Sequence, residues 1–158
     1  MFRELTRKHL ALSREECIRI LREETRGVLS VLGEDGYPYG MPMNHWYHEA
    51  EGALYFHCGR AGHRLDALGR SNKVSFCVYD GGERQEGQWF WHVRSVIVFG
   101  RMEIIDDEET VGTIMEPFCR KFTQDETYIR RELATFTKET LLLKLVPEHI
   151  CGKRVREA

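Results

Sequence analysis

The sequence predicts one α+β domain over residues 1–158, in which a mainly antiparallel β-sheet or barrel carries helices at its margins. Two observations lead to this fold class. Short segments rich in Val, Ile, Phe and Tyr, some alternating apolar with polar residues, fill the middle of the chain between glycine and proline turns. Segments with a helical spacing of apolar residues lie before, between and after them. The chain has neither an internal repeat nor a linker, and its length suits one domain.

The composition indicates a globular protein without a dominant charge. The formal net charge is -2 and acidic and basic residues are interspersed, which argues against general binding of nucleic acid or membrane surfaces. The five cysteines form no CxxC pair, no signal peptide is recognisable, and no apolar run approaches the ~20 residues that span a bilayer. We therefore expect a reduced, cytoplasmic protein.

A helix is expected over 13–24, because its start carries a capping signature. Ser13 can accept a hydrogen bond from the Glu16 N–H while the Glu16 carboxylate reaches back, which is a capping box. Leu12 and Cys17 are placed as a hydrophobic staple across this start.

The next segment indicates a β-hairpin. A strand over 28–32 is followed by an Asp-Gly turn at 34–36, and its partner strand would cover 37–47. Pro38 and Pro42 in that partner each remove a hydrogen-bond donor from the ladder. We therefore expect an edge strand or a locally broken strand, which exposes backbone groups that a ligand can use.

Further strands and helices follow. Pro117 is expected to kink or split a helix, Pro147 to end the last strand, and Gly100 to mark a bulge or bend. The charged tail over 152–158 is expected to be loose. The expected elements are strands at 53–58, 74–79, 89–105 and 141–146, and helices at 63–69, from Asp106 and Asp107 to about 121, and at 125–135.

The most informative stretch is the loop from Gly59 to Arg64, between an expected strand and an expected helix. Its glycines allow close backbone approach, a helix N-terminus offers unpaired N–H groups, and His63 and Arg64 add cationic side chains. This combination suits an anion, and we interpret it as a site for a flavin phosphate. The motifs GxxxxGK[ST] and GxGxxG are absent, so a strand-to-helix turn with exposed cations is the alternative.

Histidines and a cysteine crowd the same region, which raises the question of a zinc site. His45, His48, His57, Cys58 and His63 do not have the spacing of a zinc finger, and we expect no metal. A hydrogen-bonded structural role is the alternative for His57. The sequence around Cys58 offers no activating base with a third orienting group, so we interpret it as a small buried residue rather than a nucleophile.

Aromatic residues gather over 89–92, directly before Val93, Arg94 and Ser95. We interpret them as sheet core and as part of a dimer face, because aromatic side chains contribute large contact areas to interfaces. A direct role in ligand binding is the alternative for the two tryptophans.

Three motifs, in this order, resemble the pyridoxamine 5′-phosphate oxidase-like family of FMN-binding split barrels, in particular its nitroimidazole-resistance (Nim-type) branch. The resemblance covers about residues 10–150. It implies a six-stranded, mainly antiparallel split β-barrel, and a homodimer that binds FMN at the subunit interface. The motifs are Pro42-Met43-Asn44-His45-Trp46-Tyr47, the run from Leu54 to Cys58 with Gly62-His63-Arg64-Leu65-Asp66-Ala67-Leu68, and the segment from Val93 to Gly100.

The resemblance also implies roles for individual residues. The backbone of residues 42–44 would contact the flavin ring, and the start of the helix at 63–65 would hold the phosphate, Leu65 through its N–H. Arg94 and Ser95 would come from the second subunit's strand or support the site from it. His57, beside the flavin, would be the catalytic residue. The full set of implied cofactor-binding residues is Pro42, Met43, Asn44, His45, His57, Cys58, His63, Arg64, Leu65, Arg94 and Ser95.

The sequence departs from the family in two places. The oxidase signature Ser-Arg-Lys is replaced by Gly62-His63-Arg64, which has one permanent cation fewer, and the arginine-rich C-terminal substrate segment is absent. We therefore do not expect pyridoxamine phosphate as the substrate. We predict an FMN-binding oxidoreductase that reduces nitro-aromatic or other small electron acceptors, with a nicotinamide donor. Two alternatives stay open: a non-catalytic carrier or sensor of flavin or haem, and an interaction domain that has lost its ligand.

Overall fold

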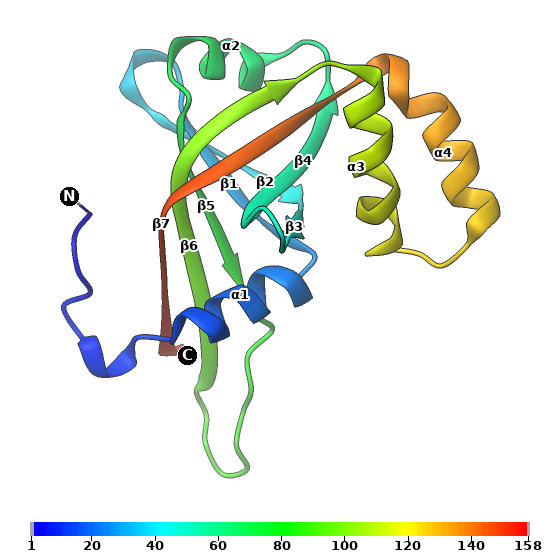
Figure 1. Ribbon diagram of the computed structural model, residues 1–158. Coiled ribbons are helices and arrows are strands. Elements are labelled where there is room, and N and C mark those ends of the chain that lie inside the picture. The colour runs from blue at the N-terminus through cyan, green and yellow to red at the C-terminus, as the bar shows by residue number, and fades with distance from the viewer. Residues whose placement is uncertain (1, 158) are drawn as a thin grey trace.

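A computed structural model describes residues 2–157, except for the side chains at 135–138 and 157 (Figure 1). All described strands belong to one antiparallel sheet in the order β2-β1-β5-β6-β7-β4-β3. The strands are β1 Arg26–Leu32, β2 Pro38–Asn44, β3 Trp46–His48, β4 Ala53–Gly59, β5 Lys73–Tyr79, β6 Trp91–Ile105 and β7 Thr140–Glu157. The helices are α1 Arg14–Glu23, α2 His63–Arg70, α3 Glu108–Arg120 and α4 Glu126–Glu139, with short 3-10 turns η1 Lys8–Leu10 and η2 Glu34–Gly36.

The predicted α+β class and the antiparallel sheet are confirmed, but the described chain has seven strands rather than six. The difference arises because the single strand expected over 37–47 is divided into β2 and β3. His45 lies between them, and its N–H donates to the carbonyl of Thr25 rather than to a strand of the sheet.

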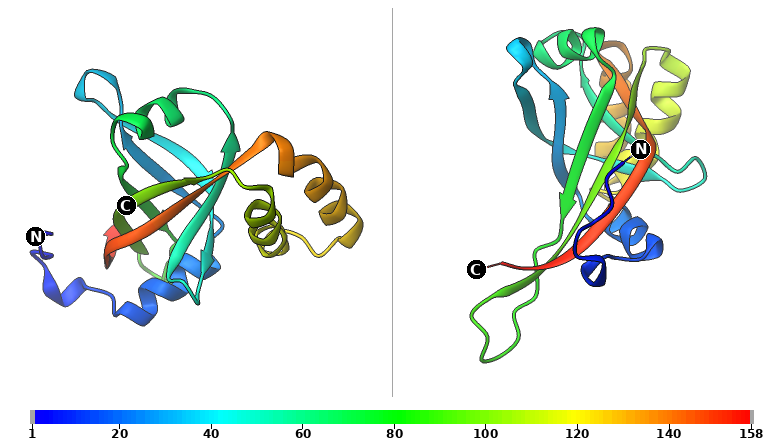
Figure 2. Two further views of the ribbon diagram at one scale, coloured as in Figure 1. Left: turned by 45° about the horizontal axis from the view of Figure 1, so that its top comes forward. Right: turned by 90° about the vertical axis from the view of Figure 1, so that its left-hand side faces the viewer.

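The sheet curls into a half-barrel because its two edge strands are neighbours in sequence. β2 and β3 lie at opposite edges of the sheet, yet only His45 separates Asn44 from Trp46. The two edges must therefore approach each other at this point. The long strands β6 and β7 bend across the sheet, and two further views show the same curvature (Figure 2).

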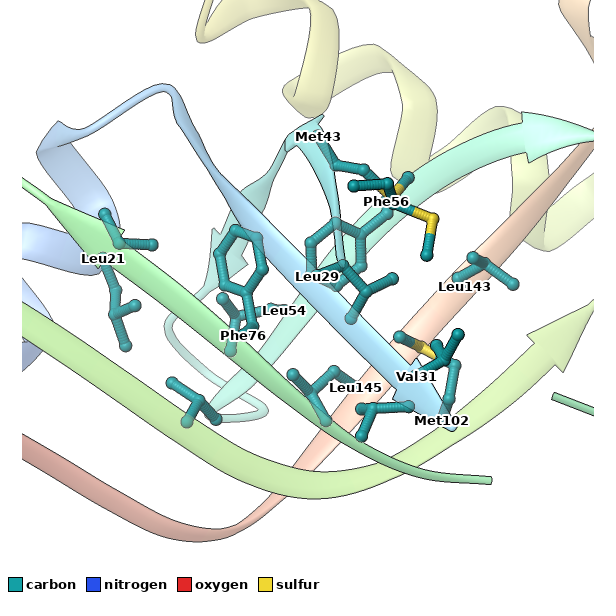
Figure 3. Packing of buried hydrophobic residues seen from close by; sticks show 14 of the residues in the cluster. Leu21, Leu29, Val31, Met43, Leu54, Phe56, Phe76, Met102, Leu143 and Leu145 are labelled. Carbon is teal, nitrogen blue, oxygen red and sulfur yellow. The ribbon is translucent and has the colours of Figure 1, made fainter. Parts of the chain in front are cut away.

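Side chains on the inner face of the sheet form the main hydrophobic core. Leu29, Phe56, Phe76, Leu143 and Leu145 are fully buried there and come from β1, β4, β5 and β7 (Figure 3). Each apolar side chain of this size contributes about 1.5–3 kcal/mol relative to an exposed one. A second buried cluster joins α3 to the other face of β4 and β7, and consists of Ala53, Tyr55, Val111, Ile114, Met115, Phe118 and Leu142.

α1 begins as the sequence predicts. The Ser13 N–H donates to the Glu16 carboxylate at 2.8 Å, and the Glu16 N–H donates to Ser13 Oγ at 3.1 Å, which completes the capping box. Cys17, Ile20 and Leu21 form the buried face of the helix and join the main core.

The hairpin between β1 and β2 matches its prediction. Asp35 and Gly36 have positive φ angles of 54° and 78°, the conformation that an Asp-Gly turn favours. Both expectations for the proline-containing strand are confirmed, because β2 is an edge of the sheet and ends at Asn44. Pro38 and Pro42 are tolerated there because β2 pairs with β1 alone.

β6 and β7 pair along their length with one bulge. Gly100 lies opposite Pro147 while Phe99 lies opposite His149, so β7 carries an extra residue here and the irregularity expected at Gly100 is confirmed. The expectation that Pro147 ends the strand is wrong, because the bulge accommodates a residue without an N–H donor. The expectation of a loose tail is also wrong, since residues 152–157 pair with β6.

Pro117 was expected to kink or split a helix, and the split is wrong. α3 continues through Pro117 to Arg120. The proline lies in the last turn, where few helix bonds remain to be lost, and the neighbouring Met115 and Phe118 are buried against the sheet. Packing therefore outweighs the missing bond.

Aspartates cap the starts of α3 and α4, and the cap at Asp107 is the predicted one. Asp107 accepts a hydrogen bond from the Thr110 N–H at 2.8 Å at the start of α3. Asp125 accepts hydrogen bonds from two backbone N–H groups at the start of α4, which extends beyond the predicted end at 135 to Glu139. Within residues 2–157 no helix has the length and apolarity needed to cross a membrane.

Candidate functional site

The loop between β4 and α2 presents backbone donors at the start of a helix. Gly62 has a φ of 126°, which side-chain-bearing residues rarely adopt, and an added Cβ there would meet no atom within 4 Å. The N–H groups of Leu65 and Asp66 donate to the Gly62 carbonyl at 2.9 and 3.2 Å. The N–H groups of His63 and Arg64 donate to no acceptor among the described residues. The donors without an acceptor are thus those of His63 and Arg64, whereas the Leu65 N–H, which the resemblance implied as a phosphate ligand, donates to the Gly62 carbonyl.

Two adjoining clefts meet at Arg64. The first, of about 270 Å³, lies over the loop between β4 and α2, and the second, of about 300 Å³, lies between the end of β2 and β4. Volumes near 300 Å³ are at the lower end of those that hold small molecules, so the two clefts together suit an elongated ligand. The first is lined by Tyr39, Cys58, Gly59, Ala61, Gly62, His63, Arg64 and Leu65, and the second by Arg26, Pro42, Met43, Asn44, His57 and Arg64.

Arg64, like the more exposed Arg26, is a cation of this groove that no described carboxylate compensates. Its side chain is half-buried and its Nε–H lies 2.9 Å from the sulfur of Met41. No described carboxylate lies within 4.0 Å of its guanidinium, whereas Arg60 in the same loop pairs with Asp106. A half-buried guanidinium with spare N–H donors is a strong partner for a phosphate or carboxylate.

Tyr39 and Arg26 belong to the groove although sequence reasoning did not single them out. The Tyr39 ring stacks on the His63 imidazole, with centroids 4.3 Å apart and planes 18° apart. The Arg26 Nε–H donates to the Asn44 side chain at 3.2 Å, and the two residues are cross-strand partners. The alternation of side chains along β2 and its pairing register with β1 decide that these two residues lie at the groove. The register is known only from the fold, so the sequence alone did not identify them.

His57 lines the second cleft as a half-buried imidazole. Its ring lies edge-on to Phe118, with centroids 5.3 Å apart. Burial, and then the nearby Arg64 charge, lower the pKa of His57 below its ordinary value. The imidazole is therefore neutral at neutral pH, which suits a hydrogen-bonding group or a proton acceptor.

Cys58 follows on β4 and lines the first cleft instead, because successive side chains of a strand point to opposite faces. Burial raises the pKa of its thiol, and this outweighs the opposing effect of Arg64. A buried, protonated thiol is a weak nucleophile, which agrees with the interpretation of Cys58 as a packing residue. All five cysteines are free thiols.

The side chain of His45 lies away from these clefts. It is fully buried, and its Nε2–H donates to the carbonyl of Leu21 in α1 at 2.8 Å. Nδ1 has no hydrogen-bond partner among the described residues, and burial lowers the pKa to about 3. His45 thus ties the β2–β3 junction to α1.

Among the described residues no three His, Cys, Asp or Glu side chains gather as a metal site.

The start of β6, which carries Arg94 and Ser95, lies at the opposite end of the molecule from α2, at the loop that joins β5 to β6 (Figure 1). The Arg94 Nε–H donates to Asp80 at 2.6 Å, and Asp80 also accepts the backbone N–H groups of Arg94 and Gly82. Within one chain these residues do not join Arg64. Their contribution to a cofactor site from a second subunit stays a prediction.

The fold and the groove together define a class of protein. It is a curled antiparallel barrel in which a strand, a glycine-containing loop and a helix bring a cationic side chain close to backbone N–H donors. The sequence profile of the pyridoxamine 5′-phosphate oxidase family matches residues 13–154. The chain therefore belongs to that family, and the resemblance of its motifs is confirmed. No curated protein sequence matches the chain.

Solved structures share the fold over nearly the whole chain. A candidate 5-nitroimidazole antibiotic resistance protein of Bacteroides thetaiotaomicron has a TM-score of 0.77 and 20% identity, covering 94% of this chain and 88% of its own. The flavocytochrome Anf3 of Azotobacter vinelandii has a TM-score of 0.70 and 21% identity, covering 95% and 72%. An FAD-binding protein of Mesorhizobium loti has a TM-score of 0.62 and 20% identity, covering 92% and 96%. Identities this low establish the fold alone.

Proposed function

We propose that this chain is an FMN-dependent oxidoreductase that reduces small electron acceptors such as nitro-aromatic compounds. Family membership supports flavin binding, and so do the flavin-binding relatives of the same fold. The observation that carries the proposal is Arg64, a half-buried guanidinium without a carboxylate partner among the described residues, placed where two clefts meet.

The residues of the groove fit the two ends of FMN. The N–H groups of His63 and Arg64, together with the Arg64 guanidinium, would hold the phosphate. The backbone and side chains of residues 42–44, with His57, would contact the flavin ring in the second cleft. When bound, the flavin supplies hydride and electron transfer between a nicotinamide donor and the acceptor. The protein supplies orientation and local charge.

His57 would act on the acceptor as a neutral imidazole. Because its pKa is lowered, it would bind the acceptor through a hydrogen bond or accept a proton, rather than stand ready as a cationic acid. Phe118 at its edge restricts the orientation of the ring.

We extend the proposal to the choice of cofactor and to a homodimer. The groove offers one anion cradle, at the start of α2, which suits the single phosphate of FMN. A second copy of the chain would close the groove and bring Arg94 and Ser95 to it. Titration with FMN and with FAD, and sedimentation with and without flavin, test these two points; tighter binding of FAD or a flavin-saturated monomer would contradict them.

The first test is flavin binding by the purified protein. We expect absorption bands of bound flavin, in place of a Soret band of haem, and a rise in melting temperature with added FMN. Arg64→Ala should weaken FMN binding by about 1.5–3 kcal/mol, the value of a charge-assisted hydrogen bond. Arg70→Ala is the matched control, because it removes the same side chain from an exposed position at the other end of α2.

Three results decide between the candidate functions. Equal FMN affinity in the Arg64→Ala and Arg70→Ala proteins would remove Arg64 from the site. Protein that binds no flavin would exclude the proposal. Bound flavin that neither NADH nor NADPH reduces under anaerobic conditions would favour a non-catalytic carrier or sensor.

A further inference from the structure

The second cleft is lined by two arginines that differ in their surroundings. Arg64 is half-buried and lines both clefts, whereas Arg26 is exposed and lines the second cleft alone, beside Asn44 and His57. The single phosphate of FMN would engage Arg64 and the start of α2, as proposed above. Arg26 then remains as a cation at the cleft proposed for the flavin ring, which carries no phosphate.

Contacts from three elements fix the backbone that leads to Arg26. Lys121, at the end of α3, donates from Nζ to the carbonyl of Glu24, and Figure 1 shows that end of α3 near the start of β1. The His45 N–H, at the β2–β3 junction, donates to the carbonyl of Thr25 at 3.3 Å. Arg26 itself is the first residue of β1 and pairs with β2. The base of its side chain is therefore held in place before any ligand arrives.

The guanidinium of Arg26 is held by one edge and open at the other. Its Nε–H donates to the Asn44 side chain at 3.2 Å, and within the described chain no residue accepts a hydrogen bond from its Nη groups. A carboxylate within 4.0 Å is also lacking there, whereas Arg22, four positions earlier, lies 3.9 Å from Glu49. A guanidinium fixed in this way presents a planar fork of donors that matches one carboxylate.

The other walls of the second cleft favour an anion with an apolar body. None of its lining residues is acidic, and His57 is neutral because burial and the Arg64 charge lower its pKa. Pro42 and Met43 add apolar surface. The charge of the cleft is therefore positive, and it attracts an anionic molecule over a neutral one of the same shape.

We propose that Arg26 is a specificity-determining residue, which binds a carboxylate carried by the electron acceptor and so favours planar aromatic acids over neutral compounds of the same shape. The inference rests on the flavin-dependent function proposed above and adds the charge of the acceptor to it. One fork of donors suits one carboxylate. The diphosphate of a nicotinamide donor would need more cations than the second cleft offers, since Arg64 is its only other arginine.

Benzoate and benzamide test the inference without any reaction, because they have nearly the same shape and no nitro group. Titration calorimetry of the full chain with saturating FMN, at constant ionic strength, gives both affinities. We expect the parent protein to bind benzoate about fivefold more tightly than benzamide, and Arg26→Gln to remove this difference. Arg22→Gln is the matched control, because it removes an arginine from a nearby exposed position outside both clefts and should keep the difference.

Steady-state kinetics with NADH give a second readout. The ratio of kcat/KM for 4-nitrobenzoate to that for 4-nitrobenzamide should fall about fivefold in Arg26→Gln. The change should lie in KM rather than kcat, because the contact with the carboxylate forms on binding and does not change during the reaction. Melting temperatures without ligand show whether each variant is folded.

Several results would overturn the inference. The parent protein could bind benzoate and benzamide equally, or Arg26→Gln could keep the difference. An equal loss in Arg22→Gln would assign the preference to the general charge of this region. Weaker FMN binding or a higher KM for NADH in Arg26→Gln, with the preference for benzoate kept, would assign Arg26 to the cofactor or the donor. Parent protein that binds no FMN would exclude the proposed function as well, whereas protein that binds FMN without distinguishing the two ligands would exclude only the role of Arg26.

Discussion

The imidazoles of His45 and His57 both have lowered pKa values, but their surroundings differ. His45 is sealed inside the fold and donates one hydrogen bond to α1, so burial alone dominates its pKa. His57 lies at a cleft wall, where burial is joined by the charge of Arg64. His45 therefore contributes to the stability of the fold, whereas His57 is a residue of the candidate site.

His45 predicts how stability changes in acid. Its pKa is about 3 in the folded state and 6.5 when unfolded, so the unfolded chain takes up the proton first. Its contribution is complete above pH 6.5 and is lost progressively down to about pH 3, with a slope of up to about 1.4 kcal/mol per pH unit. His45→Gln can keep the donor to Leu21 without titrating. Urea unfolding at pH 7, 5 and 4 should show a shallower acid decline for the variant; an unchanged slope would contradict this.

His57 predicts the pH profile of the proposed reaction. If the neutral imidazole is the working form, reduction of the acceptor should be constant near neutrality and fall at a pH below 6.5, where the ring takes up a proton. His57→Gln removes that titration, so the acid limb should disappear from the rate of acceptor reduction at saturating FMN. A profile identical to that of the parent protein would assign the limb to another group.

The loop pattern predicted that His63 and Arg64 bind an anion, and the motif resemblance added His57 and His45 to the same site. In the described chain His57, His63 and Arg64 line two adjoining clefts, whereas the His45 side chain lies away from them. The partner of His45 is Leu21, 24 positions earlier, and only the packing of α1 against the β2–β3 junction brings the two together. The Leu65 N–H is a similar case, because the conformation at Gly62 decides which N–H groups of the first turn remain available.

At the scale of elements, the β6–β7 bulge depends on a missing side chain. A Cβ on Gly100 would lie 2.1 Å from the backbone oxygen of Val146, so the two strands could not keep their distance. We expect Gly100→Ala to destabilise the protein by about 1–3 kcal/mol, as overpacking does. Gly69→Ala in α2 is the control, since a Cβ there meets nothing within 4 Å and should stabilise by about 0.5–1 kcal/mol. Thermal unfolding should move in opposite directions for the two variants; equal shifts would contradict the role of the bulge.

Two of the proline expectations failed, each for its own reason. Pro147 should end a strand when the ladder is regular, but the irregular pairing opposite Gly100 removes the need for its N–H. Pro117 should interrupt a helix, but near the end of α3 the lost bond is outweighed by buried neighbours. Local signals for caps, turns and strand alternation succeeded because they act within a few residues. The effect of a proline depends on the strand that it pairs with or on the packing of its neighbours, and the sequence alone specifies neither.

At the scale of the whole molecule, the C-terminal half of β7 holds the N-terminal segment in place. The Leu12 N–H donates to the Gly152 carbonyl at 3.0 Å, and Ala11 forms a β-bridge with Lys153. Deleting residues 152–158 should lower the melting temperature and remove hydrogen-exchange protection from the Leu12 amide. Lys153→Ala keeps the backbone ladder and should preserve that protection. Retained protection in the truncated chain would show that the segment is anchored elsewhere.

The α+β class and most element positions were predictable, whereas the order of the strands was not. The strand pairs β1–β2 and β5–β6 join strands that are neighbours in sequence, and the turn residues between those strands predict them. The pairing of Leu54 with Leu145 joins positions far apart in sequence, and no local pattern specifies it. The motif resemblance filled this gap for the barrel as a whole, but it gave six strands where seven are described.

The place of β7 in the sheet has a consequence for biosynthesis. β7 is the last strand of the sheet to be made, yet it lies between β6 and β4. Until the ribosome has released it, the nascent chain can form only two separate pieces, β2-β1-β5-β6 and β4-β3, each with an open edge on β6 or β4. Open edges of this kind are where unfinished chains aggregate or exchange strands. We therefore expect the chain to remain dependent on ribosome-associated or early chaperones until β7 has emerged, when this one strand joins both halves.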